Sequence, residues 1–195
     1  NYGYVLENHP EYPRLDEVLY IMAYNEYQAG KKDDAIKNYS KLIRQYPDSE
    51  YIPDSYLALG EHYFADNKLD KATKAYQKAY DVGRERKKPS TYVYAQYKLA
   101  WCDYNAQEYE KALGKFKDVI DEAEKGEKAK DGDGGNIRLK REALNDMVLT
   151  FSQLDAIEEA YDYIKKKSDP KEAYRLTGKL AGIYDSQGKF KQQIA

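Results

Sequence analysis

Residues of the types that catalyse reactions or bind metals are few in this chain, and their spacing suits neither task. Its 195 residues include two histidines, His9 and His62, and one cysteine, Cys102. Neither histidine has a cysteine or carboxylate at metal-ligand spacing, so we expect His62 to lie on a helix surface. Cys102 follows Trp101 in a helical pattern, which favours a small buried thiol over a nucleophile. Because phosphate-binding loops, dinucleotide fingerprints and nucleophile elbows are also missing, we expect no catalytic residue, no enzyme activity and no cofactor.

Residues 131–142 are a weak candidate for a calcium site. Asp131, Asp133 and Glu142 occupy the first, third and twelfth positions of an EF-hand loop. The sixth position of such a loop needs glycine for a sharp turn, but here it is Asn136. The fifth position is a glycine, which offers no side-chain oxygen. We therefore predict a flexible polar linker and no bound metal.

Charge and hydropathy narrow the kinds of partner. The formal net charge is −2 and the mean hydropathy is −0.95. A near-neutral chain lacks the basic face that neutralises phosphates, which argues against nucleic acid. No apolar run approaches the ~20 residues that span a membrane, and no signal peptide is recognisable in the sequence. The basic segment 84–88 is expected to be a solvated loop, with a contact to an acidic partner as the alternative.

Tyrosine is the anomaly of the composition. The chain has 22 tyrosines, but only 4 phenylalanines and 1 tryptophan. Tyrosine combines apolar area with a polar tip, so it suits a wet binding face as well as a half-buried packing seam. The elements that carry these rings decide between the two uses.

Self-similarity is the strongest signal about those elements. Residues 1–35 align without a gap on residues 38–72. An alanine recurs at one position of successive repeats, at Ala35, Ala72, Ala112 and Ala160. A fifth repeat has Gln193 at this position. The sequence therefore predicts tandem copies of one structural unit.

Each copy is predicted to be a pair of antiparallel helices. The apolar residues of the second repeat, for example, recur at i, i+3, i+4 and i+7, at Tyr56, Leu59, Gly60 and Tyr63. Gly60 and Ala72 are expected where the two helices cross, since a larger side chain would push the backbones apart. Tandem helix pairs make an all-α fold, an α-solenoid of about 4–5 repeats.

The predicted organisation follows the repeats. Residues 1–12 are the end of a preceding repeat helix, and residues 13–125 are repeats one to three. Residues 126–136 are a flexible loop rich in glycine, aspartate and lysine, and residues 137–195 are degenerate repeats four and five, the last of them truncated. We expect this chain to be an excerpt of a longer array.

The repeats resemble a known family. The second repeat is similar to a tetratricopeptide repeat (TPR) in its pattern Tyr56-x2-Leu59-Gly60-x2-Tyr63…Ala72-x3-Tyr76-x2-Ala79. The segments RQYPDSEYIPDSYLALGEHYFADNKLDKA and YKLAWCDYNAQEYEKALGKFKDVI further resemble Gram-negative envelope TPR proteins, such as the Tol–Pal-associated coordinator, the β-barrel assembly lipoprotein and long myxobacterial TPR proteins. This resemblance implies a periplasmic or envelope-associated protein, with a cytoplasmic one as the alternative.

The resemblance also implies where a partner binds. In TPR proteins the first helices of successive repeats line a concave face. The corresponding positions and their neighbours in repeats one to three are Tyr20, Tyr24, Tyr27, Leu57, Glu61, Phe64, Tyr94, Tyr97, Lys98, Trp101, Tyr104 and Asn105. The lysines and asparagines that grip a C-terminal carboxylate in chaperone-binding TPRs are missing from these positions. A groove of aromatic rings suits a peptide with apolar anchors.

The same rings have a structural alternative, because aromatic residues at helical spacing are more often core than site. We assign Tyr56, Tyr63, Tyr76 and Phe116 to the core. Tyr27 and Tyr104 are expected to rotate partly inward. The function that follows is a non-enzymatic scaffold that binds a protein or peptide in an envelope complex for assembly, division or gliding motility; no small-molecule substrate is expected. The alternatives are a cytoplasmic adaptor or regulatory module, or the accessory segment of an enzyme.

Overall fold

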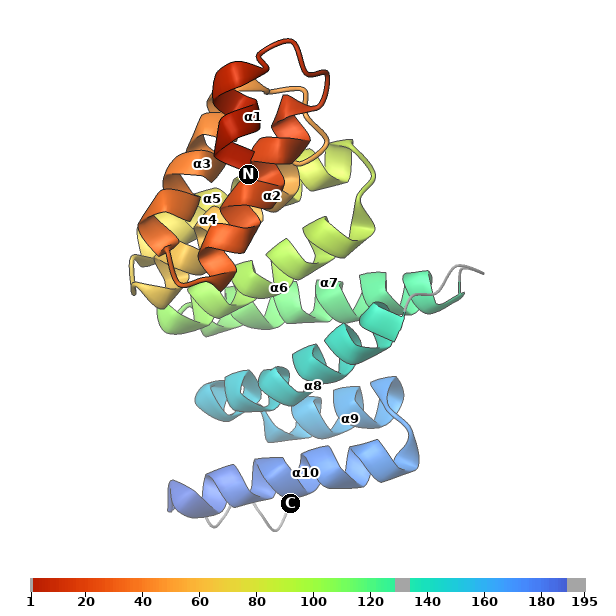
Figure 1. Cartoon of the computed structure of the whole chain (residues 1–195). Coiled ribbons are helices and arrows are strands. Elements are labelled where there is room, and N and C mark those ends of the chain that lie inside the picture. The colour runs from red at the N-terminus through yellow and green to blue at the C-terminus, as the bar shows by residue number, and fades with distance from the viewer. Residues whose placement is uncertain (1, 129–133, 189–195) are drawn as a thin grey trace. The chain divides into compact units, whose positions relative to one another are not determined.

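Helices joined by short turns make up the described chain, residues 2–128 and 134–188 of this computed structural model. These residues contain no strand. The helices are α1 Tyr2–Asn8, α2 Leu15–Gln28, α3 Lys32–Gln45, α4 Ile52–Ala65, α5 Leu69–Glu85, α6 Pro89–Asn105, α7 Tyr109–Lys128, α8 Gly134–Leu154, α9 Ile157–Lys167 and α10 Pro170–Ser186 (Figure 1). The predicted all-α repeat fold is confirmed.

The chain divides into two compact parts, which we describe separately. The N-terminal part is Asn1–Cys102 and the C-terminal part is Asp103–Ala195. In the N-terminal part α2 packs on α3, α3 on α4, and α4 on α5. In the C-terminal part α7 packs on α8, α8 on α9, and α10 on both α8 and α9, which gives the successive layers in Figure 1. Each part is therefore built by stacking neighbours along the chain.

One backbone feature marks the turn inside every repeat. A residue with positive φ follows each first helix, at Gly30, Asn67, Gln107, Asp155 and Gly188. Each lies five residues before the recurring alanine position, the last of which, Gln193, is outside the described residues. In the second repeat the N–H of Lys68 then donates to the carbonyl oxygen of Tyr63 at 2.8 Å, the bond that closes a helix C-terminus around a left-handed residue. The backbone thus carries the same period as the sequence through all five repeats.

The helices of repeat two approach closely at Gly60, as predicted. A Cβ added to Gly60 would lie 2.5 Å from the Cδ1 and Cε1 atoms of Tyr76. Tyr76 is fully buried, and so is Ala72 on the same helix. Because the ring of Tyr76 fills the space of the missing side chain, glycine sets the spacing between α4 and α5.

The predicted core residues are buried to different degrees. Tyr76 and Phe116 are fully buried, whereas Tyr56 and Tyr63 are partly buried against the cluster around Leu59. Cys102 is 3% exposed, which confirms the buried thiol. Tyrosine therefore serves repeat packing as well as the surface.

Helices extend into both ends of the segment 126–136 that was predicted to be a loop. Helix α7 continues to Lys128 and α8 begins at Gly134, so the loop prediction for 126–136 is wrong at both ends. Residues 129–133 lie outside the described residues. Within the described ranges no helix is both long enough and apolar enough to cross a membrane.

Candidate functional site

The residues predicted to bind a partner lie on the first helices of repeats one to three. We call those in the N-terminal part the aromatic face: Tyr20, Tyr24 and Tyr27 on α2, Leu57, Glu61 and Phe64 on α4, and Tyr94, Tyr97, Lys98 and Trp101 on α6. Tyr104 and Asn105 fall in the C-terminal part. The aromatic face is therefore carried by three helices of similar position in their repeats.

Lys98 contacts several residues of this set and its core neighbour Tyr76, and its side chain is only 14% exposed. Its ammonium group is 3.2 Å from a carboxylate oxygen of Glu61. It also lies over the rings of Phe64, Tyr76 and Tyr94, at 4.8, 5.9 and 6.0 Å from their centroids. Attraction between the cation and the ring faces adds to the ion pair. One lysine thus links α4, α5 and α6 and orders three rings.

Glu61 connects this cluster to the core below it. The hydroxyl of Tyr76 donates a 2.8 Å hydrogen bond to Glu61. Burial, followed by the negative charge of Glu61, raises the pKa of Tyr76 far above its usual value, so the phenol stays protonated and remains a donor. The carboxylate is shared between Tyr76 and Lys98 and is held in one position.

Tyr20 packs between repeats one and two. Its ring stacks on that of Tyr51 with centroids 4.6 Å apart, and it meets the ring of Tyr39 edge-on at 5.9 Å. Burial, followed by the charge of Asp54, raises the pKa of Tyr20 to about 12. The structural alternative therefore holds for much of this ring.

The other residues of α2 and α4 in this set range from packed to open. Tyr24 is 49% exposed, the most open residue of the aromatic face. Tyr27 is partly buried against the core cluster around Ala23, as predicted, with the ammonium of Lys32 6.0 Å from its ring centroid. Leu57 is half-buried against the cluster around Tyr76. Tyr24 is thus the open end of a partly packed surface.

Acidic residues beside the aromatic face are bound by neighbouring repeats. The hydroxyl of Ser49 donates to Asp16 at 2.6 Å, and that of Thr91 donates to Asp54 at 2.6 Å. Asp54 also pairs with Lys88 at 3.5 Å. With their charges hydrogen-bonded or paired internally, these carboxylates contribute little attraction for a charged partner.

The basic segment 84–88 makes internal contacts that sequence reasoning missed. Arg86 donates to the carbonyl oxygens of Ser49 and Pro47, and Lys88 donates to that of Glu50 at 2.6 Å. The expectation of a solvated loop is therefore wrong for Arg86 and Lys88. Each pair is separated by about one repeat length, which is the signal that points to such contacts.

Three further residues considered in the sequence analysis are His62, Tyr104 and Asn105, which differ in their exposure. The expectation that His62 lies on a helix surface is wrong, because its side chain is only 12% exposed. Its Nε2 atom lies 3.7 Å from a carboxylate oxygen of Asp66. Tyr104 meets Tyr109 edge-on at 5.4 Å, and burial raises its pKa, which fits the expected inward rotation. Asn105 is exposed.

Of the three acidic residues in the candidate calcium loop, only Glu142 lies among the described residues. Asp131 and Asp133 lie outside them. From Gly134 the chain is helical, and Glu142 pairs with Arg138 at 2.8 Å. Within residues 2–128 and 134–188 no three His, Cys, Asp or Glu side chains gather as metal ligands. The residues of the aromatic face offer ring faces and hydroxyl groups.

Comparison with solved structures places the fold among TPR-like arrays. BtubC (BKLC) from P. vanneervenii is 14% identical over 97% of this chain and 79% of that chain, with a TM-score of 0.64. MamA is 20% identical over 96% of this chain and 87% of its own, with a TM-score of 0.60. A putative kinesin light chain from Podosopora anserina, with nearly identical TPR-like repeats, is 12% identical over 94% of this chain and 92% of that one, with a TM-score of 0.63.

Comparison of the sequence points the same way. Residues 17–49 and 94–125 match the tetratricopeptide repeat family. The first segment contains most of α2 and all of α3, and the second contains most of α6 and of α7. No curated protein sequence matches the chain. The two family matches and the shared fold support a TPR protein.

Proposed function

We propose that this chain is a non-enzymatic scaffold that binds a peptide or protein segment on its aromatic face. The observation that carries the proposal is the position of Lys98, whose ammonium lies between Glu61 and the rings of Phe64 and Tyr94. This contact orders aromatic side chains from two repeats before a ligand arrives. A preorganised surface loses less side-chain entropy on binding.

The partner is expected to bind through apolar or aromatic anchors. The acidic side chains around the face are paired or hydrogen-bonded, as at Asp54 and Glu61. Tyrosine and tryptophan present apolar area at low entropic cost and dominate binding hot spots. An extended or helical segment with two or three apolar anchors suits this chemistry.

A capture experiment tests the proposal. Protein purified with the variant Tyr97→Ala/Trp101→Ala, or with Tyr24→Ala, is compared with wild type for recovery of partners from native cell extract. Recovery is expected to fall about tenfold, as for hot-spot residues. Tyr161→Ala is the matched control, because Tyr161 is a tyrosine of similar exposure, 51%, on α9 and is not one of the residues of this face. Circular dichroism must show equal helicity, and unchanged recovery with the variants would sink the assignment.

The location of the scaffold is a further part of the proposal. The likeness of repeats one to three to Gram-negative envelope TPR proteins supports a place in an envelope complex. Fractionation of native cells tests this, with the protein detected by antibody beside periplasmic and cytoplasmic markers. Recovery only with the cytoplasmic marker would favour the adaptor alternative.

A further inference from the structure

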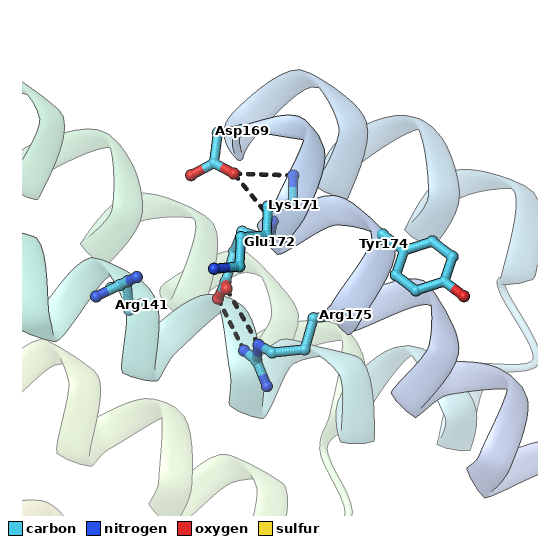
Figure 2. Close-up of a pocket in the computed structure, with 6 residues that line it drawn as sticks. All are labelled: Arg141, Asp169, Lys171, Glu172, Tyr174 and Arg175. Carbon is cyan, nitrogen blue, oxygen red and sulfur yellow. Dashed lines mark hydrogen bonds and ion pairs between the residues drawn. The ribbon is translucent and has the colours of Figure 1, made fainter.

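A second candidate surface lies in the C-terminal part and shares no residue with the aromatic face. It is an open pocket of about 610 Å³ between α8 and α10. The residues that line it are Arg141, Asp169, Lys171, Glu172, Tyr174 and Arg175 (Figure 2). Three of these are cations and two are carboxylates, so the pocket is lined mainly by charged groups.

Both carboxylates are bound within α10. Asp169 caps the helix by accepting from the backbone N–H groups of Lys171 and Glu172 at 2.9 and 3.0 Å. Glu172 accepts two hydrogen bonds from Arg175, at 3.0 and 2.8 Å, in the fork geometry shown in Figure 2. These bonds lower the pKa of Glu172 and keep it ionised. The helix N-terminus and one arginine are thus already occupied.

Two cations have no such partner. Neither the Arg141 guanidinium nor the Lys171 ammonium forms a hydrogen bond or ion pair with any described residue. Both residues are exposed. They come from different helices, α8 and α10, and face one pocket. The charge of Arg141 contributes to the lowered pKa of Glu172, but its N–H groups and the Lys171 ammonium can still bind an anionic ligand.

Open positions on α10 follow the residues that line the pocket. Tyr174 is 84% exposed, the highest fraction among the exposed large hydrophobic residues. Gly178 and Gly182 follow at intervals of one helical turn, and a Cβ added to either would meet nothing within 4 Å. A peptide backbone can therefore approach α10 closely beyond the tyrosine ring.

The geometry points to a binding site for an acidic segment of a protein partner. Carboxylates of the segment pair with Arg141 and Lys171, and an apolar or aromatic side chain packs on Tyr174. The backbone of the segment then follows α10 over Gly178 and Gly182. The residues of this site differ from those of the aromatic face, so the chain offers binding residues for two partners or for two segments of one partner.

Fluorescence anisotropy tests the site with a short fluorescein-labelled peptide. The peptide is rich in glutamate, has one central tyrosine and carries an amidated C-terminus. The Arg141→Gln/Lys171→Gln variant is expected to bind it at least about tenfold more weakly, and Tyr174→Ala several-fold more weakly. Wild-type affinity is expected to fall steeply between about 50 and 500 mM NaCl.

Controls separate this site from overall charge and from the aromatic face. Lys165→Gln/Lys166→Gln removes the same charge from exposed positions of α9 and is expected to bind like wild type. Tyr97→Ala/Trp101→Ala is also expected to bind the peptide normally, so the two proposals fail independently. Equal binding by the Arg141→Gln/Lys171→Gln variant overturns the site. Equal binding of a lysine-rich counterpart, or tighter binding of a single-stranded oligonucleotide, overturns the acidic-peptide assignment.

Discussion

At the scale of single residues, Gly60 in repeat two and Lys98 in repeat three both contact the ring of Tyr76. Gly60 leaves room for the buried ring of Tyr76, 2.5 Å from where a Cβ would stand. Lys98 brings a charge into the half-buried layer above, where Glu61 and three ring faces surround it. Tyr76 links the two residues. Its ring packs on Gly60 and lies beneath the Lys98 ammonium, and its hydroxyl donates to Glu61, the ion-pair partner of Lys98. A change at either residue therefore reaches the aromatic face through Tyr76.

Replacing Gly60 by alanine is expected to lower the free energy of unfolding by ~1–3 kcal/mol, because the new methyl group overlaps the ring of Tyr76. The overlap outweighs the ~1 kcal/mol that alanine gains over glycine in a helix. Urea denaturation followed by circular dichroism measures the change. Gly114→Ala on α7 is the control, since a Cβ there would meet nothing within 4 Å. This change is expected to raise the free energy of unfolding. Destabilisation of the same size at both positions would contradict the overlap.

The ion pair between Glu61 and Lys98 is expected to contribute about 1 kcal/mol in a double-mutant cycle with Glu61→Gln and Lys98→Met. Burial of Lys98 and the hydrogen bond from Tyr76 hold the pair in place, which reduces the entropy lost on pairing. The exposed pair Glu108 and Lys111, at the same distance of 3.2 Å, is the matched control and is expected to couple by about 0.3 kcal/mol. Coupling energies of equal size for the two pairs would refute the role assigned to the cluster.

At the scale of elements, the turn between the two helices of a repeat is the most regular feature. Gly30, Asn67, Gln107, Asp155 and Gly188 all have φ between 52° and 79°. Glycine adopts this conformation without strain, whereas a residue with a Cβ pays a steric cost of about 1 kcal/mol. Repeats two to four therefore hold a mildly strained turn that repeat one avoids.

Gln107→Gly is expected to raise the free energy of unfolding by up to ~1 kcal/mol, because glycine relieves the strained φ of 63°. The converse change, Gly30→Ala, is expected to lower it by about 1 kcal/mol at a φ of 79°. A Cβ added at Gly30 would meet nothing within 4 Å, so the expected loss there comes from the backbone conformation and not from a steric overlap. Thermal unfolding of both variants measures the pair, and shifts in the same direction would disprove the strain argument.

At the scale of the whole molecule, charges are balanced locally and not by distant fields. The net charge is −2, although 34% of the residues are charged. In the C-terminal part, Lys167 joins α9 to Asp121 and Glu124 of α7 at 2.7 and 2.8 Å. Burial raises the pKa of Glu124, but hydrogen bonds from Lys167 and Lys140 outweigh it and leave the pKa lowered. Arg175 lowers that of Glu172 in the same way.

Acid is therefore expected to destabilise the protein. A carboxyl group whose pKa is lower in the folded state stabilises the fold fully above its unfolded pKa, about 4.3 for glutamate. This stability is lost as the pH falls through the lower folded value. The midpoint temperature of unfolding should decrease as the pH is lowered from about 5 to about 3. The decrease should be smaller for Glu172→Gln, which has no such proton to gain. An equal fall in wild type and variant would show that Arg175 does not stabilise the carboxylate.

The repeats themselves could be predicted from sequence. Helical spacing, the recurring alanine and the glycine at the tight crossing are properties of residues a few positions apart. A helix converts such spacing directly into a packing face. The turns with positive φ keep the same register in the degenerate fourth and fifth repeats, which agrees with the repeats predicted from sequence. The ends of the segment 126–136 were not, because polar residues with glycine read as a loop where α7 and α8 extend into it.

Only the tertiary structure decided how each side chain of a repeat is used. Tyr20 and Tyr24 lie one turn apart in sequence, yet one stacks on Tyr51 and the other is 49% exposed. Likewise Arg86 donates hydrogen bonds to carbonyl oxygens of the preceding repeat, while Arg141 makes no hydrogen bond with a described residue. These differences depend on which atoms the neighbouring repeat brings within 3–4 Å. The sequence by itself determined a solenoid of helix pairs, since that follows from local periodicity; the stacking of repeats determined which rings and charges remain for a partner, since those contacts join residues one repeat apart.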